Sequence, residues 1–327
     1  MKKIVFRWFT VFLVVIFVGG VVHHNRNYIY HAVFFAKEYF KLSSRPDLCW
    51  TMINVNSSQL QGDAHLIQIK NGNTVLVDAG NIAPAKAQLI PFLKRNSISE
   101  IDKIFISHPH IDHYGGVRVL LDAGIKIKEI YFNIPNKSIC DREIPWGCNY
   151  DDILETHQKL RKNGVTVKTI KANQSFDLGK GAIMKILYAF DGVHTPVGRT
   201  DINDLSLIMM LEYSEYKFLF TGDLNMGIGT YLSKVPEDLT ANVIKVPHHG
   251  TEGLAPNSFF EKVNAEYALV PSPKHLWCSK RSSRARNWFS KNNTPVFVNG
   301  FHGDVKVVVN NGRLMIRPEV ETEINCD

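Results

Sequence analysis

The sequence predicts an α/β fold in which two β-sheets form the core and helices lie outside them. Predicted strands and helices alternate along much of the 327 residues. Hairpins are interspersed among them, and this mixture is typical of a two-sheet core covered by helices. The part after residue 48 opens with β-rich sequence, in which Asn71-Gly72-Asn73 is a strong hairpin signal between two predicted strands. Several later apolar runs end in loops that contain histidine or aspartate.

The first 26 residues are predicted to form a membrane anchor or a signal peptide. Lys2, Lys3 and Arg7 precede an uncharged, apolar run from residue 8 to residue 22. With the apolar residues before it, this run approaches the roughly 20 residues that span a bilayer. A basic start favours a cytoplasmic N-terminus with the rest of the chain exported. A cleaved signal peptide has the same layout, so both alternatives stay open, and we favour the uncleaved anchor.

The remaining chain is predicted to contain a connector, one domain and a tail. Residues 27–47 form an aromatic-rich connector that ends in a break. Residues 48–318 form the domain, and residues 319–327 form an acidic, flexible tail. The expected helices lie at 83–96, 117–123 and 151–163, and the expected strands lie at 50–55, 65–70, 74–77, 101–106, 125–133, 165–170, 182–188, 207–213, 217–220, 241–246, 267–270, 296–299 and 305–309.

The composition is that of an ordinary globular protein with a surplus of positive charge. Hydrophobic residues make up 45% and charged residues 21%, and the formal net charge is +7. This charge favours acidic partners such as nucleic acid, phosphoesters or an anionic membrane surface. None of the five cysteines forms a Cys-x-x-Cys pair, which argues against a structural zinc finger. Cys140 and Cys148 flank a short segment, and they form either a local disulfide or two separate thiols.

One loop carries most of the side chains that favour metal binding. It follows the apolar run Ile104-Phe105-Ile106, which is predicted to be a buried strand. Within six residues of the loop lie His108, His110, Asp112 and His113. Neutral imidazoles and carboxylates are ligands that zinc, manganese and iron favour. Six residues cannot easily aim all four groups at one ion, so we expect the first pair and the second pair to serve two divalent ions.

Two later strand ends supply further candidate ligands. Asp223 follows the predicted strand 217–220, and we expect its two oxygens to bridge two metals; the alternative is that it caps the next helix. His248 and His249 follow the predicted strand 241–246 and point in opposite directions if the backbone is extended. We therefore expect one of them to bind metal and favour His248, which leaves His249 for the substrate or a neighbour.

Taken in order, these motifs resemble those of the metallo-β-lactamase fold superfamily. The resemblance covers roughly residues 50–310 and is closest to the hydrolase domain of ComEC-type DNA-uptake proteins and its stand-alone relatives. The segments that carry it are Gly62-Asp63-Ala64, Asp78-Ala79-Gly80, His108-Pro109-His110-Ile111-Asp112-His113, Asn203-Asp204-Leu205-Ser206, Thr221-Gly222-Asp223 and Lys245-Val246-Pro247-His248-His249-Gly250.

The resemblance implies an αββα sandwich with two divalent ions, zinc or manganese, and a single ion as the alternative. It implies that Asp78 lies behind the metal ligands and orients nearby loops. Full two-metal sites of the superfamily have a further histidine before the bridging aspartate, and His194 lies in that interval. The ComEC-type branch has no histidine at this position, so Asn203 or Asp204 is the alternative third ligand.

The expected function is hydrolysis by a metal-activated water, with Asp112 or Asp223 orienting the nucleophile. The charge and the resemblance favour a phosphodiester such as DNA, cut at the outer face of the cytoplasmic membrane, or in the periplasm or outside the cell if the N-terminal segment is cleaved. Lys280, Arg281 and Arg284 are expected to hold the phosphate backbone, unless they lie on a solvated helix face. The alternatives are a phosphocholine-type or other small-ester hydrolase and a degenerate domain that binds nucleic acid or polymer without cleaving it.

Overall fold

The computed structural model describes residues 46–58, 60–142, 148–190, 196–197 and 201–326. The predicted anchor, nearly all of the predicted connector and His194 lie outside these ranges. Across the described ranges, no helix is both long and apolar enough to cross a membrane.

The first sheet has the strand order β15-β14-β1-β2-β3-β4-β5-β6. Its members are β1 (Leu48–Met52), β2 (His65–Ile69), β3 (Thr74–Val77), β4 (Glu100–Phe105), β5 (Lys126–Tyr131), β6 (Thr166–Lys168), β14 (Val305–Asn310) and β15 (Arg313–Pro318). The expected hairpin is present, because β2 and β3 pair antiparallel. From β3 to β6 the strands are parallel, which requires crossover connections between them.

The second sheet has the strand order β13-β12-β11-β10-β9-β8-β7. Its members are β7 (Ser175–Gly179), β8 (Ala182–Tyr188), β9 (Ile208–Tyr213), β10 (Tyr216–Phe220), β11 (Val243–Lys245), β12 (Tyr267–Val270) and β13 (Val296–Val298). β10, β11, β12 and β13 run parallel, whereas β7, β8, β9 and β10 pair antiparallel. The sequence pattern did not predict β7 and β15, which carry polar and charged residues on exposed positions.

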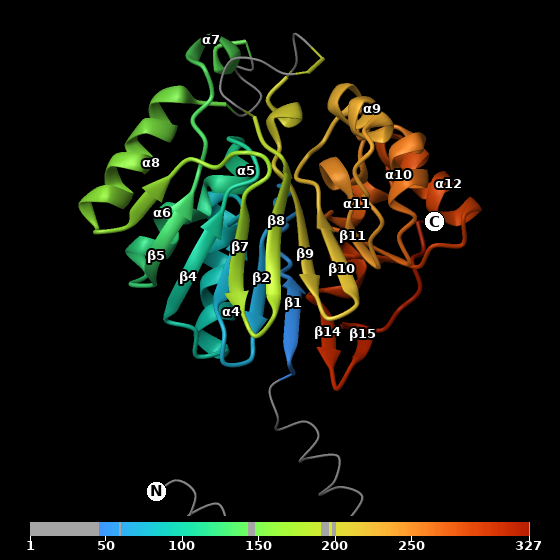
Figure 1. Ribbon diagram of the computed structural model, residues 1–327, viewed down its shortest axis with the longest axis horizontal. Coiled ribbons are helices and arrows are strands. Elements are labelled where there is room, and N and C mark those ends of the chain that lie inside the picture. The colour runs from blue at the N-terminus through green and yellow to red at the C-terminus, as the bar shows by residue number, and fades with distance from the viewer. Residues whose placement is uncertain (1–45, 59, 143–147, 191–195, 198–200, 327) are drawn as a thin grey trace, which may run out of the picture. The chain divides into compact units, whose positions relative to one another are not determined.

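Helices cover the outer faces of both sheets, which gives the expected αββα layers. Figure 1 shows α6 and α8 on one flank and α9, α10 and α12 on the other, with the strands between them. The longer helices are α4 (Ile90–Arg95), α6 (Gly116–Asp122), α8 (Tyr150–Lys162), α9 (Met226–Lys234), α10 (Asn257–Val263) and α12 (Ser283–Lys291). Short helices are α3 (Ile82–Pro84), α5 (Ile111–Tyr114), α7 (Lys137–Cys140), α11 (Lys274–Trp277) and α13 (Asn299–His302).

The helix expected at 83–96 is broken into three pieces. A π-helical segment, η1 (Ala85–Leu89), separates α3 from α4. Pro84 and Pro91 lie at these junctions, and each lacks the backbone N–H that a continuous α-helix uses. The periodicity of the sequence therefore placed the element correctly but missed its interruption.

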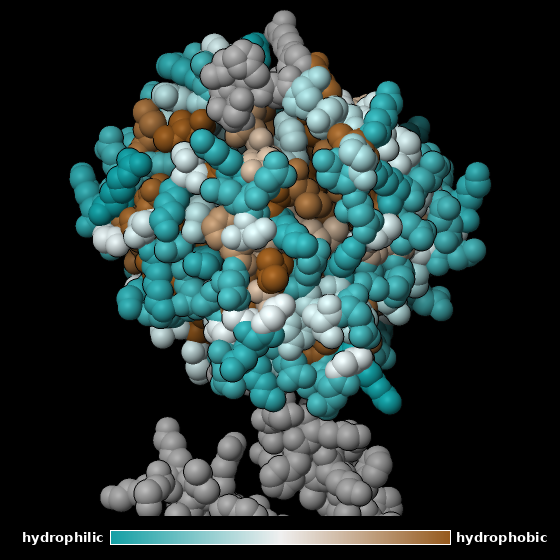
Figure 2. All heavy atoms as spheres, viewed as in Figure 1, coloured by the Kyte–Doolittle hydropathy of each residue, from teal (hydrophilic) through white to brown (hydrophobic). Residues whose placement is uncertain are grey.

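The core lies between the two sheets and is centred on aromatic side chains. Trp50 of β1 is fully buried, and its ring lies 4.5 Å from that of Phe220 and 6.2 Å from that of Phe218, both on β10. Trp50 also donates its indole N–H to His65 Nδ1 at 3.2 Å. Figure 2 shows hydrophilic side chains over most of the face in view, with apolar patches between them. Burial of apolar surface between the sheets thus supplies the main favourable term of folding.

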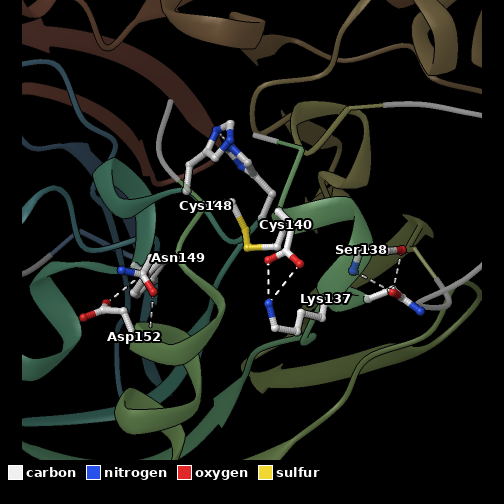
Figure 3. Close-up of a disulfide and its surroundings, with 11 residues drawn as sticks. Lys137, Ser138, Cys140, Cys148, Asn149 and Asp152 are labelled. Carbon is white, nitrogen blue, oxygen red and sulfur yellow. Dashed lines mark hydrogen bonds and ion pairs between the residues drawn. A yellow bond between two sulfur atoms is a disulfide. The ribbon is translucent and has the colours of Figure 1, made fainter. Parts of the chain in front are cut away.

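The described residues contain two disulfides. Cys140 and Cys148 are bridged beside α7, which settles the alternative left open by the sequence (Figure 3). Cys278 is bridged to Cys326, which the sequence did not indicate. The tail expected to be flexible is instead held in place, since Glu319 N and Val320 N also donate to Asp304 O and His302 O.

Candidate metal centre

The predicted site residues gather where the carboxyl ends of strands from both sheets meet. Asp78 follows β3, the histidine loop follows β4, Asp223 follows β10, and His249 follows β11. The sheets are joined at this edge by Leu207, whose N–H donates to Ser107 O at 2.8 Å. A site at the carboxyl ends of strands is common in α/β proteins, because loops from several strands converge there.

The histidine loop is fixed from behind by Asp78. One oxygen of this carboxylate accepts from Ser107 N at 2.7 Å, and the other accepts from Ser107 Oγ at 2.7 Å. The second oxygen also lies 2.8 Å from His113 Nδ1. Asp78 is almost completely buried and has a φ of 57°. The residue therefore sets the orientation of the His113 ring.

Potential ligand atoms of Asp112, His113, Asp223 and His249 lie close to one another. His249 Nε2 lies 3.2 Å from Asp223 Oδ2 and 3.3 Å from Asp112 Oδ2. His113 Nε2 lies 3.3 Å from Asp223 Oδ2 and 4.0 Å from Asp112 Oδ1. Ligand atoms bound about 2.1 Å from a tetrahedral zinc ion lie about 3.4 Å from one another, so this spacing suits one such ion.

The tautomers of His113 and His249 also favour a metal ion at this position. His113 Nδ1 faces Asp78 Oδ2, and His249 Nδ1 lies 2.8 Å from the carbonyl oxygen of Pro271. Because these oxygens only accept, each ring carries a proton on Nδ1 and turns the Nε2 lone pair toward Asp112 and Asp223. Both Nε2 atoms are buried, and within the described part of the chain neither makes a hydrogen bond. Lone pairs and carboxylates that face one another in a buried site repel unless a cation lies between them, and a divalent metal fits this set of ligands.

Charge is the dominant feature of the site. Burial lowers the pKa of His113, but Asp223, Asp78 and the other nearby carboxylates outweigh this effect and hold it well above its ordinary value. Burial raises the pKa of Asp223, but His249, His113 and Lys245 together hold it well below its ordinary value. The site thus holds ionised carboxylates and attracts an added positive charge, for which protons and a metal ion compete.

A second group of candidate ligands lies beside the first. His108 Nε2 is 3.1 Å from His110 Nδ1, and His108, His113 and Asp223 offer ligand atoms within 4.8 Å of one another. Burial, together with His113, holds the pKa of His108 well below its ordinary value, so this ring is neutral. His108 and Asp223, together with His113 or the adjacent His110, are therefore candidates to hold a second ion.

Asp204, an expected alternative third ligand of this group, uses one carboxylate oxygen to accept backbone hydrogen bonds. Asp204 Oδ1 accepts from the backbone of Asn225 at 3.0 Å and of Ile228 at 3.4 Å, at the start of α9. Asn203 lies in the same short 3₁₀ turn, η2 (Asn203–Leu205), and is partly exposed. His194 lies outside the described residues.

The late histidine pair differs from expectation in its backbone. Both His248 and His249 have left-handed conformations, with φ of 50° and 52°, so the expected extended backbone is wrong. This turn directs His249 into the group with Asp223, while the centroid of the His248 ring lies 6.4 Å from that of His249. In the described residues, neither group of potential metal ligands includes His248. Two consecutive left-handed non-glycine residues are strained, and such strain concentrates at functional sites.

Two buried residues of the site belong to motifs quoted from the sequence but were given no role there. Lys245 Nζ lies 2.5 Å from Asp63 Oδ2 and 3.2 Å from Asp223 Oδ1. The expectation that both oxygens of Asp223 bridge metals conflicts with this contact, because Oδ1 faces the ammonium and only Oδ2 faces the histidines. The available signals were a lysine at the end of an apolar strand and an aspartate in the Gly62-Asp63-Ala64 turn.

The basic stretch on α11, α12 and the turn between them makes mostly structural contacts. Arg284 donates to the carbonyl oxygens of Leu254 and Ala255 and to Asn257 Oδ1, the last at 3.0 Å. Arg281 Nε lies 2.8 Å from Glu252 Oε1. Lys280 is exposed on a 3₁₀ turn, η4 (Lys280–Ser282). Of the three residues expected to bind substrate, Arg284 thus has its guanidinium engaged by the protein itself.

Comparisons with known proteins agree with this fold. Residues 58–131 match the model of the Metallo-beta-lactamase superfamily. ComE operon protein 3 of Bacillus subtilis (strain 168) is 25% identical over 189 residues, which cover 57% of this chain and 22% of that protein. Endoribonuclease YSH1 of Saccharomyces cerevisiae is 24% identical over 212 residues, which cover 58% of this chain and 25% of that protein. The crystal structure of the metallo-beta-lactamase fold protein YhfI from Bacillus subtilis matches with a TM-score of 0.50 and 14% identity, covering 83% of this chain and 100% of that chain.

The chain thus contains a segment that matches the Metallo-beta-lactamase superfamily, and its αββα layers and its groups of potential metal ligands agree with that match. The chain is similar to ComE operon protein 3 and to Competence protein ComA of Neisseria gonorrhoeae, the kind of protein that its motifs resemble. The match spans about a quarter of the length of these curated relatives.

Proposed function

We propose that the chain is a metal-dependent phosphodiesterase. The observation that carries the proposal is the arrangement of His113 and His249, whose Nε2 atoms turn their lone pairs toward two carboxylates at 3.2–4.0 Å. We assign Asp112, His113, Asp223 and His249 to one divalent ion. His108 and His110, with Asp223, would hold a second ion.

The charge of the site supports a pair of ions. Asp63, Asp78, Asp112 and Asp223 supply four carboxylates against the single ammonium of Lys245. Three negative charges therefore remain without a fixed counter-charge at the site. With one divalent ion the site would stay negatively charged. With two ions it would carry a positive charge, which favours an anionic substrate.

When bound, the divalent ions polarise the substrate and lower the pKa of a bound water to about 7. The protein supplies orientation and access. Asp112 keeps 18% of its side chain exposed, whereas His249 and His113 are fully buried and Asp223 keeps 3%. The substrate therefore approaches from the side of Asp112, whose carboxylate can also accept a proton from the nucleophile. Burial raises the pKa of Asp112, but His113 and His249 outweigh it and keep the group ionised for this task.

A phosphodiester substrate is supported by charge and by relatives. The net charge of +7 favours an anionic partner. One relative is named as an endoribonuclease, which is consistent with action on nucleic acid. DNA is the first polymer to test.

The protein is proposed to act outside the cytoplasm, held by its N-terminal segment. The apolar run at 8–22 has the layout of an anchor, and the basic residues before it favour export of the domain at 48–318. The disulfides Cys140–Cys148 and Cys278–Cys326 fit an oxidising compartment, where such bridges persist.

The test is metal analysis of the purified full-length chain together with hydrolysis of bis-p-nitrophenyl phosphate and of single-stranded DNA. We expect bound zinc or manganese, turnover that a chelator abolishes, and recovery on adding either ion back. Turnover of small phosphoesters without cleavage of DNA would narrow the substrate to a small ester. A chain that binds neither ion and hydrolyses nothing would be a binding module and would refute the proposal.

A further inference from the structure

Lys245 is a charged residue in an otherwise apolar strand. It ends β11 after Val243 and Ile244, is followed by Val246, and is only 1% exposed. Its ammonium has three donors, and the structure offers three acceptors: Asp63 Oδ2 at 2.5 Å, Gly222 O at 2.5 Å and Asp223 Oδ1 at 3.2 Å. The group is thus fully engaged inside the site, although it does not ligate a metal.

Stability alone is a poor reason for this arrangement. Burying an ion pair costs desolvation energy that its attraction often only offsets, and apolar residues of similar size are frequently as stable. The neighbours of Lys245 on the strand are all buried and apolar, so a fourth apolar residue would fit the sheet. The lysine is therefore better explained by what it does to the carboxylates than by its support of the core.

Asp63, the partner of Lys245, lies behind the ligands. Its oxygens are 3.3 Å from His249 Nδ1 and 3.8 Å from His113 Nδ1, and each of these nitrogens has a nearer partner at 2.8 Å. Asp63 therefore faces the edges of the rings opposite the Nε2 atoms. Its own backbone is tied to the histidine loop, since Asp63 N donates to Asp112 O at 3.1 Å.

We infer that Lys245 is a positioning residue that restricts Asp223 to one metal-facing oxygen. The ammonium holds Oδ1, and Asp63 and Gly222 hold the ammonium, so the Asp223 carboxylate cannot rotate freely. Oδ2 alone then faces His113 and His249, at 3.3 and 3.2 Å. This inference rests on the proposed metal site and specifies how that site uses its shared carboxylate.

The backbone around Asp223 supports the same fixed geometry. Gly222 has a φ of 49°, and a Cβ on it would lie 2.6 Å from Ser206 Oγ, so only glycine fits. Asp223 N donates to that same Ser206 Oγ at 2.8 Å. Main chain and side chain of Asp223 are therefore both anchored, and Lys245 supplies the anchor of the side chain.

The experiment removes the anchor together with the Asp63 carboxylate, so that Asp223, which the metal would neutralise, is the one former partner of Lys245 to keep its charge. In the double variant K245M/D63N the ammonium and its partner are neutralised together, while every proposed metal ligand remains. The chain is loaded with Co²⁺, whose visible bands report the number and arrangement of ligands. We expect the bands to weaken and shift, because the released carboxylate of Asp223 can bind with both oxygens. We also expect kcat to fall about 10–100-fold, as is typical when a group behind metal ligands is lost, with KM little changed.

The control is K262M, which removes another partly buried lysine bonded to protein carbonyls, those of Leu232 and Val235. It should lower stability but leave the Co²⁺ bands and kcat as in the unmodified chain. Should K245M/D63N fail to fold, K245M/D63L replaces the pair by apolar side chains and makes the same measurement.

A folded double variant with unchanged Co²⁺ bands and unchanged kcat would overturn the inference, because the pair would then serve the fold alone. A different result tests the proposed function instead: if the unmodified chain binds no Co²⁺, Zn²⁺ or Mn²⁺, the metal site itself is refuted.

Discussion

Nε2 of His249 lies 3.2 Å from Oδ2 of Asp223, although the two residues follow different strands and are 26 positions apart. The contact joins the loop after β10 to the loop after β11. A further backbone bond at 3.4 Å, from His248 N to Gly222 O, holds the same two loops together. Whether His248 or His249 joins the site thus depends on how these two loops pack against each other, and not on the local sequence.

The first prediction concerns this choice between neighbouring histidines. H249A should lose the ion held by Asp112, His113 and Asp223, because a neutral imidazole ligand is removed. Its divalent-ion affinity should fall by more than the roughly 10–100-fold typical for residues behind the ligands. H248A should keep the metal stoichiometry of the unmodified chain. Isothermal titration with Zn²⁺ on chelator-treated protein measures both.

H248A is a close control, since both variants truncate a left-handed histidine in the same turn. Loss of metal in H248A with retention in H249A would restore the assignment favoured by the sequence. Equal loss in both would mean that the strained turn, and not a ligand, had been tested.

The second prediction concerns the disulfides. In the chain-entropy model a bridge stabilises more when it closes a longer loop. The Cys278–Cys326 bridge spans 48 positions and the Cys140–Cys148 bridge spans 8. Replacing the longer bridge by serines should cost about 4 kcal/mol, and replacing the shorter one about 2.5 kcal/mol. Urea unfolding measures the difference, with C49S as the control because Cys49 is unbridged. Equal losses would show that strain or residual structure outweighs loop length.

The third prediction concerns His157 on α8. Its side chain is buried, and the centroid of its ring lies 4.8 Å from that of Phe132. Among the described residues, neither nitrogen of the His157 ring has a hydrogen-bond partner. Burial, with a smaller effect from Arg161, lowers its pKa to about 4. His157 in the unfolded chain therefore binds a proton below about pH 6.5, whereas in the folded chain it does so only below about pH 4.

Stability linked to His157 is consequently complete above pH 6.5 and is lost as the pH falls toward 4. Between pH 7.5 and pH 4.5 the unmodified chain should lose roughly 2–3 kcal/mol more unfolding free energy than H157L. Denaturant unfolding at the two pH values tests this. Parallel losses in both chains would show that His157 does not titrate in this way.

The sequence revealed the layers and the metal loop because both depend on local pattern. Apolar runs that alternate with hairpin signals predicted most strands, and His108, His110, Asp112 and His113 are close together in the chain. Periodicity did not reveal β15, whose exposed positions carry Arg313 and Arg317. Nor did it reveal the Cys278–Cys326 bridge, since pairing between distant cysteines is decided by the fold.

The roles of Asp63 and Lys245 were hidden for a similar reason. Each lies within a segment that carries the family resemblance, but neither has a sequence neighbour that defines its partner. Their contact at 2.5 Å joins segments 182 positions apart, one from each sheet. A lysine in the middle of a buried apolar run was the available clue, because an unpaired charge does not persist there.

The last prediction separates substrate binding from structure in the basic stretch. Arg284 donates to Leu254 O, Ala255 O and Asn257 Oδ1, which fix the segment after the late histidines. R284M should therefore leave buried or partly buried carbonyls without donors and cost about 1–3 kcal/mol of unfolding free energy.

K280M removes an exposed lysine and should cost little stability. If the stretch also holds a phosphate backbone, K280M should raise KM for DNA and weaken its salt dependence, while KM for a small phosphodiester stays the same. A rise in KM for DNA in R284M without any loss of stability would instead give Arg284 the substrate role, because a guanidinium that supports the fold cannot be removed without cost.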